Sequence, residues 1–179
     1  MGGQGIIFAG VVLARAAALY ERPGGRELYA VQTQSYGPAA RGATSKCDAV
    51  ISDEPRFYPF VESPDFLVVM SQPAFEQYAV RVSSSTVVIL DEDAVETRPE
   101  TTHYEIPALW RAREIGHGET ANVVMLGALL AISSLVSRDA AVRALRDVLP
   151  SDATAINEKA LVEGYALASG FLAGSYDNV

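Results

Sequence analysis

The apolar residues of the chain fall into runs of two kinds, which predict strands and helices in alternation. Two short continuous runs, residues 65–70 (DFLVVM) and 86–90 (TVVIL), are typical of strands buried on both faces of a parallel sheet. A longer run, residues 6–20, is rich in alanine and leucine and predicts a helix that ends before Arg22-Pro23-Gly24-Gly25. The polar, glycine-containing segments between such runs predict the connecting loops.

Weaker patterns complete the predicted order of elements. Further strands are expected at residues 27–34, 48–52 and 103–106, and further helices at residues 73–82, 108–114, 121–136, 138–149 and 154–169. Pro73 suits the first turn of its helix, and Thr120 is expected to cap the helix that follows it. Buried strands alternating with helices predict an α/β fold with an open, mostly parallel, Rossmann-like sheet, flanking helices and a helical C-terminal third. No repeat or long linker divides residues 1–179, so we expect a single domain.

The overall charge excludes one large class of partners. With 14 Lys and Arg against 22 Asp and Glu, the formal net charge is −8, and no run of cations could neutralise a nucleic-acid backbone. The hydrophobic content of 49% indicates a well-filled interior or a surface that a partner covers. We therefore expect no nucleic-acid partner, while a local pair of cations could still hold a small anion.

Cysteine and histidine are too few for a metal or redox centre on this chain. Cys47 is the single cysteine, which excludes a disulfide framework and a cysteine-ligated zinc or iron–sulfur site. Its neighbourhood favours a small buried residue over a nucleophile. His103 and His117 are the only histidines, so we expect no metal site. No Ser/His/Asp or Cys/His set has a convincing context, and we expect no catalytic residues on this chain.

Neither long apolar stretch predicts a membrane span. Residues 6–20 and 123–136 are shorter than the roughly 20 residues that a bilayer requires, and Arg15 interrupts the first. The start of the chain lacks the basic region of a signal peptide. We expect a cytoplasmic protein with no membrane partner.

A glycine cluster stands directly before the first predicted helix. Gly2-Gly3-Gln4-Gly5 would offer backbone N–H groups and a positive helix end, which together suit a phosphate. The dinucleotide fingerprint fails because Phe8 stands where its third glycine belongs, and the P-loop fails because no Gly-Lys-Ser/Thr follows. A general anion site remains, with a flexible terminus as the alternative.

A polar loop predicted at the ligand-binding end of the sheet supplies cations. Residues 35–46 (SYGPAARGATSK) contain Arg41 and Lys46 and no acid, in a protein that is otherwise acidic. The alternative is an ordinary solvated loop. Asn122, near the start of a later helix, could turn its amide toward the same crevice or serve in local capping. In parallel sheets ligands collect beyond the carboxyl ends of the strands, where residues 71–72 and 91–93 also lie.

These same segments resemble the gamma subunit, or gamma domain, of the 2-oxoacid:ferredoxin oxidoreductases. The resemblance rests on four blocks that occur in the order found in that family: GGQGIIFAGVVLARAA, VQTQSYGPAARGATSKCDAVIS, PDFLVVMSQPAFEQY and ANVVMLGALLA. Together they cover most of residues 2–130. The second block is the most specific because of its length.

The resemblance implies a subunit of an enzyme that converts a 2-oxoacid and CoA into acyl-CoA, CO2 and reduced ferredoxin. It implies that thiamine diphosphate and iron–sulfur clusters are held by partner alpha, beta and ferredoxin-like subunits, and that this chain contributes CoA binding and assembly contacts. By the matching motifs, the residues that would bind CoA are Gly2, Gly3, Gln4, Gly5, Arg41, Ser45, Lys46 and Asn122. Of these, the glycine segment would receive the phosphates and Asn122 would contact the nucleotide portion.

The sequence departs from that family's pattern at two places. The family has a first strand and a further glycine before GGQG, and here only Met1 stands before Gly2, so the first strand is expected to be missing. Ala43 stands where the family has a second glycine after its arginine-glycine pair. Two alternative functions remain: a gamma-type subunit of indolepyruvate ferredoxin oxidoreductase, and a nucleotide-binding or scaffold module without enzymatic context. The sequence does not identify the 2-oxoacid.

Overall fold

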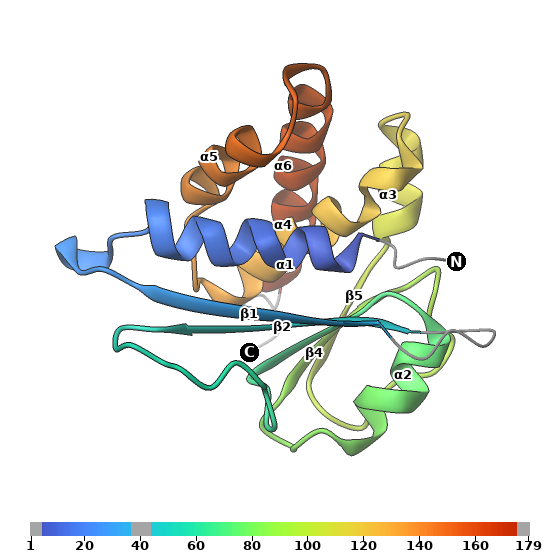
Figure 1. The fold of residues 1–179 in the computed structure, drawn as a ribbon. Coiled ribbons are helices and arrows are strands. Elements are labelled where there is room, and N and C mark those ends of the chain that lie inside the picture. Colours follow the sequence, from blue (N-terminus) through green and yellow to red (C-terminus); the bar gives the residue numbers. More distant parts are fainter. Residues whose placement is uncertain (1–4, 37–43, 175–179) are drawn as a thin grey trace.

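The computed structural model describes residues 5–36 and 44–174 of the chain. Helices α1, α4, α5 and α6 lie on one side of the strands, and the short helix α2 lies on the other (Figure 1). The described residues therefore form a mixed α/β structure whose C-terminal part, from α4 onward, is helical, as predicted. None of the described helices is both long and apolar enough to cross a membrane.

Three parallel strands form the sheet at the centre of the fold. β3 (Phe66–Val69), β4 (Val87–Asp91) and β5 (His103–Ile106) lie in the order β3-β4-β5, with Val69 opposite Leu90 and Leu90 opposite Glu105. β4 is the middle strand, and its apolar residues from position 88 to 90 are fully buried. The continuous apolar runs therefore form parallel strands, as the pattern predicted.

The first two strands form a separate antiparallel hairpin. β1 (Tyr29–Tyr36) pairs with β2 (Ser45–Ser52) over their whole length, with Tyr29 opposite Ser52 and Tyr36 opposite Ser45. β2 begins three residues before the expected strand at 48–52. No strand precedes α1 in the part of the chain that is described, and the hairpin and the parallel sheet share no ladder there.

The helices follow the predicted order. α1 (Ile6–Arg15) continues into a π-helical turn at Ala16–Tyr20, and α3 (Ala108–Glu114) has the expected bounds. α2 (Gln72–Tyr78) begins after Ser71, whose hydroxyl oxygen accepts a hydrogen bond from the Ala74 N–H at 3.4 Å. α2 then tightens into a 3-10 turn at Ala79–Arg81.

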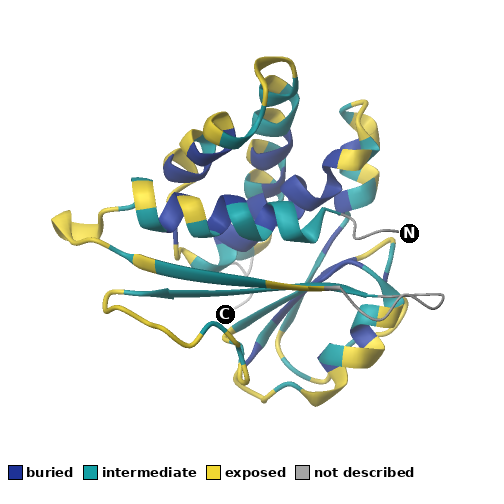
Figure 2. Ribbon diagram, viewed as in Figure 1, coloured by how far each residue is buried: buried dark blue, intermediate teal, exposed yellow. Residues whose placement is uncertain are grey.

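The helical C-terminal part is built around a fully enclosed helix. α4 (Ala121–Ser133) is buried on all sides from residue 121 to 131, and Figure 2 shows this burial against the exposed outer faces of α5 and α6. α5 (Arg138–Val148) packs beside α6 (Ser151–Gly174), which crosses α4. At the crossing, a methyl group on Gly127 would overlap the Leu161 carbonyl, and one on Gly164 would overlap the Val124 carbonyl. The two backbones are therefore in direct contact, which only glycine permits.

Two details of the prediction for this part are corrected. Thr120 does not cap α4 with its side chain; its hydroxyl donates to the His117 carbonyl at 2.8 Å, because a 3-10 turn at Gly118–Thr120 precedes the helix. α4 ends at Ser133 rather than at residue 136, since Ser134 adopts a left-handed conformation with φ 53°.

Candidate functional site

The start of α1 is held by a residue from the start of α4. Gly5 has φ 70° and ψ 15°, and its carbonyl accepts a hydrogen bond from Asn122 Nδ2 at 3.0 Å. A Cβ at this position would overlap the Asn122 side chain, so glycine is required both by the backbone conformation and by the contact. Asn122 is buried, with 5% of its surface exposed. Both residues were named from the sequence as candidates for one ligand site, and the structure places them in contact, while their binding role stays a prediction.

The first turn of α1 has the electrostatic character of an anion site. It carries no acidic residue, and the helix with its continuing π turn runs from Ile6 to Tyr20. Free N–H groups and the helix dipole place positive potential at this end. Gly2, Gly3 and Gln4, which were predicted to contribute further N–H groups, lie outside the described residues.

Ser45 and Lys46 are placed at the beginning of β2. Lys46 Nζ forms an ion pair with Asp48 Oδ2 at 2.8 Å, and it lies 5.7 Å from the centre of the Tyr78 ring on α2. Because Lys46 and Asp48 are two residues apart on a strand, their side chains lie on the same face. The ammonium group is thus already neutralised within the chain, and an incoming phosphate would compete with Asp48. Arg41, the other predicted cation, lies outside the described residues.

A cavity of about 840 Å³ brings several of the predicted residues together. Ser45 and Lys46 line it from β2, Asn122 lines it from α4, and Ile6 lines it from the first turn of α1. Gly5 contacts Asn122 at its edge. Four of the eight predicted residues are therefore described, and all four lie in or against one cavity.

Several residues that line this cavity were not predicted from the sequence. Tyr78 and Arg81, from α2 and the turn after it, line it opposite the α1 side, and Gln77 accepts a hydrogen bond from the Thr44 hydroxyl at 2.6 Å. Their position depends on how α2 packs below the strands, which no local pattern reveals. Asp48, by contrast, had a local signal, because its two-residue spacing from Lys46 on a strand predicts an ion pair.

Cys47 has the surroundings of a packing residue. It is half-buried in β2, its sulfur lies against Gly10 of α1, and Gln32 Nε2 lies 3.1 Å from it. Burial raises the pKa of the thiol, which lowers the fraction of reactive thiolate. This supports the expectation that Cys47 is a small packing residue rather than a nucleophile.

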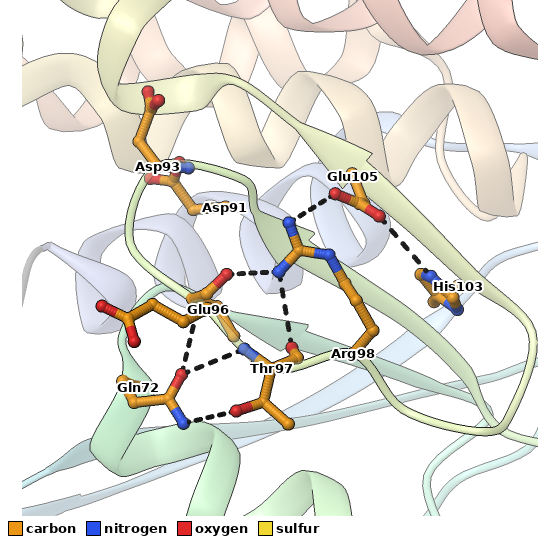
Figure 3. A network of polar contacts seen from close by, with 9 residues as sticks. Gln72, Asp91, Asp93, Glu96, Thr97, Arg98, His103 and Glu105 are labelled. Atoms are coloured by element: carbon orange, nitrogen blue, oxygen red, sulfur yellow. Dashed lines mark hydrogen bonds and ion pairs between the residues drawn. The ribbon is translucent and has the colours of Figure 1, made fainter.

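Polar groups near the carboxyl ends of the parallel strands form hydrogen bonds and an ion pair with one another. Gln72 Oε1 accepts from the N–H groups of Glu96 at 3.0 Å and Thr97 at 3.4 Å, while its Nε2 donates to the Thr97 hydroxyl at 2.9 Å (Figure 3). In the same network Arg98 forms an ion pair with Glu105 at 2.6 Å, which lowers the pKa of that carboxyl. These contacts clamp the segment between β4 and β5 to α2 and to β5.

The acidic cluster after β4 has a structural role. The Asp91 carboxylate is 1% exposed and accepts a hydrogen bond from the Asp93 N–H at 3.3 Å, and Asp93 Oδ2 accepts from the Trp110 N–H at 3.0 Å. Burial raises the pKa of Asp91 to about 6, although hydrogen bonds from the backbone of Asp93, Leu109 and Ala108 oppose the rise. The two acids hold the first turn of α3. Across residues 5–36 and 44–174, no three His, Cys, Asp or Glu side chains are grouped as a metal would require.

The chain matches one known protein family over most of its length. The family model described as pyruvate ferredoxin/flavodoxin oxidoreductase matches residues 1–167. The 2-oxoglutarate synthase subunit KorC of Methanocaldococcus jannaschii is 46% identical over 172 residues, which covers 93% of this chain and 89% of that protein.

Two solved structures share the fold. The gamma subunit of a keto/oxoacid ferredoxin oxidoreductase from Geobacter sulfurreducens superposes with a TM-score of 0.79 and 34% identity, covering 94% of both chains. The 2-oxoglutarate:ferredoxin oxidoreductase of Magnetococcus marinus, solved with 2-oxoglutarate, coenzyme A and succinyl-CoA bound, gives a TM-score of 0.77 and 25% identity. That match covers 94% of this chain but 30% of the Magnetococcus chain, so there the same domain is one part of a longer polypeptide.

Proposed function

This chain belongs to the pyruvate ferredoxin/flavodoxin oxidoreductase family as a gamma subunit of the 2-oxoacid:ferredoxin type, and we propose that its enzyme acts on 2-oxoglutarate. The observation that carries the proposal is the 46% identity to a 2-oxoglutarate synthase subunit over nearly the full length of both proteins. The reaction would convert 2-oxoglutarate and CoA into succinyl-CoA and CO2 and would reduce ferredoxin.

In this proposal the redox chemistry takes place on other subunits. Thiamine diphosphate and iron–sulfur clusters would be held by alpha, beta and ferredoxin-like partners, and the single cysteine of this chain accords with that division. This chain would contribute CoA binding and contacts for assembly.

The CoA phosphates would lie at the N-terminal end of α1. Gly2, Gly3, Gln4 and Gly5 would supply N–H groups there, and Asn122 supports this role because it fixes the Gly5 carbonyl from a buried position. Asn122 would also contact the nucleotide portion. Backbone donors at a helix start bind phosphate without a charged side chain, which suits a chain of net charge −8.

Side chains of the hairpin would add charge to the same site. Lys46 and Ser45 line the cavity that Asn122 also lines, and Arg41 lies in the connection between β1 and β2. For Lys46 to reach a phosphate, its ammonium must leave Asp48 at 2.8 Å. The pair is partly exposed, and such pairs contribute only about 0–1 kcal/mol, so a charge-assisted contact to phosphate can replace it.

Calorimetry of the reconstituted complex tests the role of Lys46. A lost charge-assisted contact of about 1.5–3 kcal/mol predicts that Lys46→Ala weakens CoA binding by about tenfold or more. The chain offers a matched control, because Lys159 is its only other lysine and is exposed on α6. Lys159→Ala should bind CoA as the unaltered chain does. An unchanged affinity in Lys46→Ala would contradict the proposed contact.

The substrate is tested separately by turnover of the same complex. Rates of ferredoxin reduction with 2-oxoglutarate, pyruvate and 2-oxoisovalerate would be compared at equal concentrations of CoA. A preference for pyruvate or 2-oxoisovalerate would overturn the assignment of 2-oxoglutarate and leave the role of Lys46 untouched.

A further inference from the structure

An exposed aromatic side chain projects from the end of the molecule that lies away from the candidate site. Phe57, in the loop between β2 and β3, exposes 93% of its surface, more than any other large hydrophobic residue described. Tyr29 at the start of β1 is 41% exposed, and Leu19 in the π-helical turn is 48% exposed. Figure 1 shows the π-helical turn, the start of β1 and the start of this loop at one end of the molecule, with the start of α1 at the other.

A hollow of about 450 Å³ lies beside Phe57. Phe57 and Pro55 line it from the loop, Leu28 and Tyr29 line it from the start of the hairpin, and Ala18 lines it from the π-helical turn. Pockets of about 300–1,000 Å³ hold whole small molecules, so this hollow has room for an aromatic side chain. A projecting aromatic ring and an apolar recess therefore stand side by side on one surface.

Hydrogen bonds hold the loop on both sides of Phe57. Ser52 Oγ accepts from the Glu54 N–H at 3.1 Å, and Thr33 Oγ1 donates to the Pro59 carbonyl at 3.4 Å. The ring of Pro59 also fixes one backbone angle of the segment. Because the loop is already anchored, an association that covers Phe57 would lose little conformational entropy.

The charges around the hollow balance, although those of the whole chain do not. The exposed charged residues of segments 18–31 and 53–58 are three arginines and three acids: Arg22, Arg26, Arg56, Glu27, Asp53 and Glu54. The whole chain has a formal net charge of −8. Two copies with that net charge repel each other, and a locally neutral surface lets them approach.

We propose that this surface, formed by residues 18–19, 27–31 and 53–58, is an interface between two copies of this chain related by a two-fold axis. In such an interface the same surface of both copies meets, so every contact occurs twice. Phe57 of each copy enters the hollow of the other, and Arg56 of each copy pairs with Glu27 of the other. Both charged side chains line the hollow, and neither forms an ion pair within the described part of the chain.

The position of the surface favours a second copy over a subunit that takes part in the reaction. In the proposed function CoA has to reach the thiamine-bearing subunit, so that subunit meets the end of this chain where α1 begins. The surface around Phe57 lies at the opposite end and stays free (Figure 1). Only this choice of occupant rests on the proposed function.

The size of the surface predicts a weak association. An aromatic side chain covers about 150–250 Å², so the exposed parts of Phe57 and Tyr29 come to roughly 250 Å² on each copy before Leu19 and the charged rim are added. Standard interfaces bury about 800 Å² on each partner, and smaller ones belong to weak, reversible complexes. We therefore expect a dimer that dissociates on dilution.

Sedimentation velocity of the full-length chain at about 1 to 200 µM tests the interface. The average mass should rise from that of one chain, 19.1 kDa, toward twice that value as the concentration increases. Phe57→Ser should weaken the association by about a hundredfold or more, because one substitution removes two identical buried contacts. The matched control is Val80→Ser, which replaces a residue that is 61% exposed in the turn after α2, and it should associate as the unaltered chain does.

Exchanging the two charges tests the pairing across the axis. Arg56→Glu or Glu27→Arg alone brings like charges together in both contacts, and each should weaken self-association by about tenfold. In an equimolar mixture of the two single variants, both contacts again join an acid to an arginine, so mixed dimers should form as readily as unaltered ones. None of these measurements involves CoA or a 2-oxoacid, so their outcome is independent of the test of the proposed function.

Four results would overturn the proposal. A chain that stays monomeric over the whole concentration range has no such interface, and self-association that Phe57→Ser leaves unchanged uses another surface. Mixed dimers no stronger than those of the single variants would refute the pairing of Arg56 with Glu27. A monomeric chain whose Phe57→Ser variant no longer binds another subunit of the reconstituted enzyme would show that this subunit, and not a second copy, covers the surface.

Discussion

Replacing Asp91 with asparagine should change how the stability of this subunit depends on pH. The carboxyl group is almost fully buried beside the first turn of α3, and burial raises its pKa from 3.8 to about 6. A difference of about two pKa units, at about 1.4 kcal/mol for each unit, corresponds to roughly 3 kcal/mol of folding free energy.

The sign follows from which state binds the proton more tightly. Because the pKa is higher in the folded protein, protonation of Asp91 favours folding. The contribution of the Asp91 carboxyl group to the free energy of unfolding is least favourable above pH 6. It becomes more favourable as the pH falls from about 6 toward 3.8, and it is constant below pH 3.8. Asparagine is neutral throughout and can still accept the hydrogen bond from the Asp93 N–H. We therefore compare the free energy of unfolding of Asp91→Asn with that of the original chain at each pH. The difference, variant minus original, should be larger at pH 8 than at pH 4 by up to about 3 kcal/mol.

Urea unfolding of both chains between pH 4 and pH 8 measures this difference. Other carboxylates titrate in the same range, and comparing two chains at each pH cancels them. Glu92→Gln removes a carboxylate one residue away in an exposed position and controls for the general loss of negative charge. A difference between Asp91→Asn and the original chain that stays constant from pH 4 to pH 8 would refute the reasoning, because a cost unrelated to ionisation does not vary with pH.

Two further predictions concern glycines. Gly164→Ala places a methyl group against the Val124 carbonyl and should destabilise the chain by about 1–3 kcal/mol, whereas Gly170→Ala in the same helix meets no atom within 4 Å and should stabilise it by up to about 1 kcal/mol. Thermal unfolding compares them, and equal midpoints would contradict the close crossing. Gly5→Ala combines a positive φ with a clash against Asn122, and should lower the melting temperature and weaken CoA binding together. Reduced stability with unchanged CoA affinity would show that Gly5 is needed for the fold but not for CoA binding.

The parallel sheet was predictable from sequence because its signals are local. The run that forms β4 is β-branched and ends in acids, and α3 follows Pro107 with bounds that the pattern gave correctly. β2 was predicted too short because it begins with Ser45 and Lys46, which have no strand preference of their own. Their partners across the ladder in β1 extend the strand, and that pairing is not a property of either segment alone.

For the candidate site, the sequence named residues but gave none of the contacts between them. Motif resemblance named Gly5 and Asn122, which are 117 positions apart and form a hydrogen bond. It did not reveal that Lys46 is held by Asp48, nor that α2 brings Tyr78 to the same cavity. The contact with Tyr78 depends on packing between β2 and α2, for which the sequence pattern carries no signal. The pair of Lys46 and Asp48 lies within β2, and its two-residue spacing was a local signal that was missed. Gly2, Gly3, Gln4 and Arg41 stay predictions, because they lie outside the described residues.

The glycine crossing of α4 and α6 has a mechanical consequence. With backbone against backbone at Gly127 and Gly164, the two helices have no side-chain layer between them that could deform. The spacing of α4 and α6 is therefore fixed by their backbones, and Asn122 lies in the first turn of α4. Since the Asn122 amide donates to the Gly5 carbonyl, the position of this helix pair also determines where α1 begins.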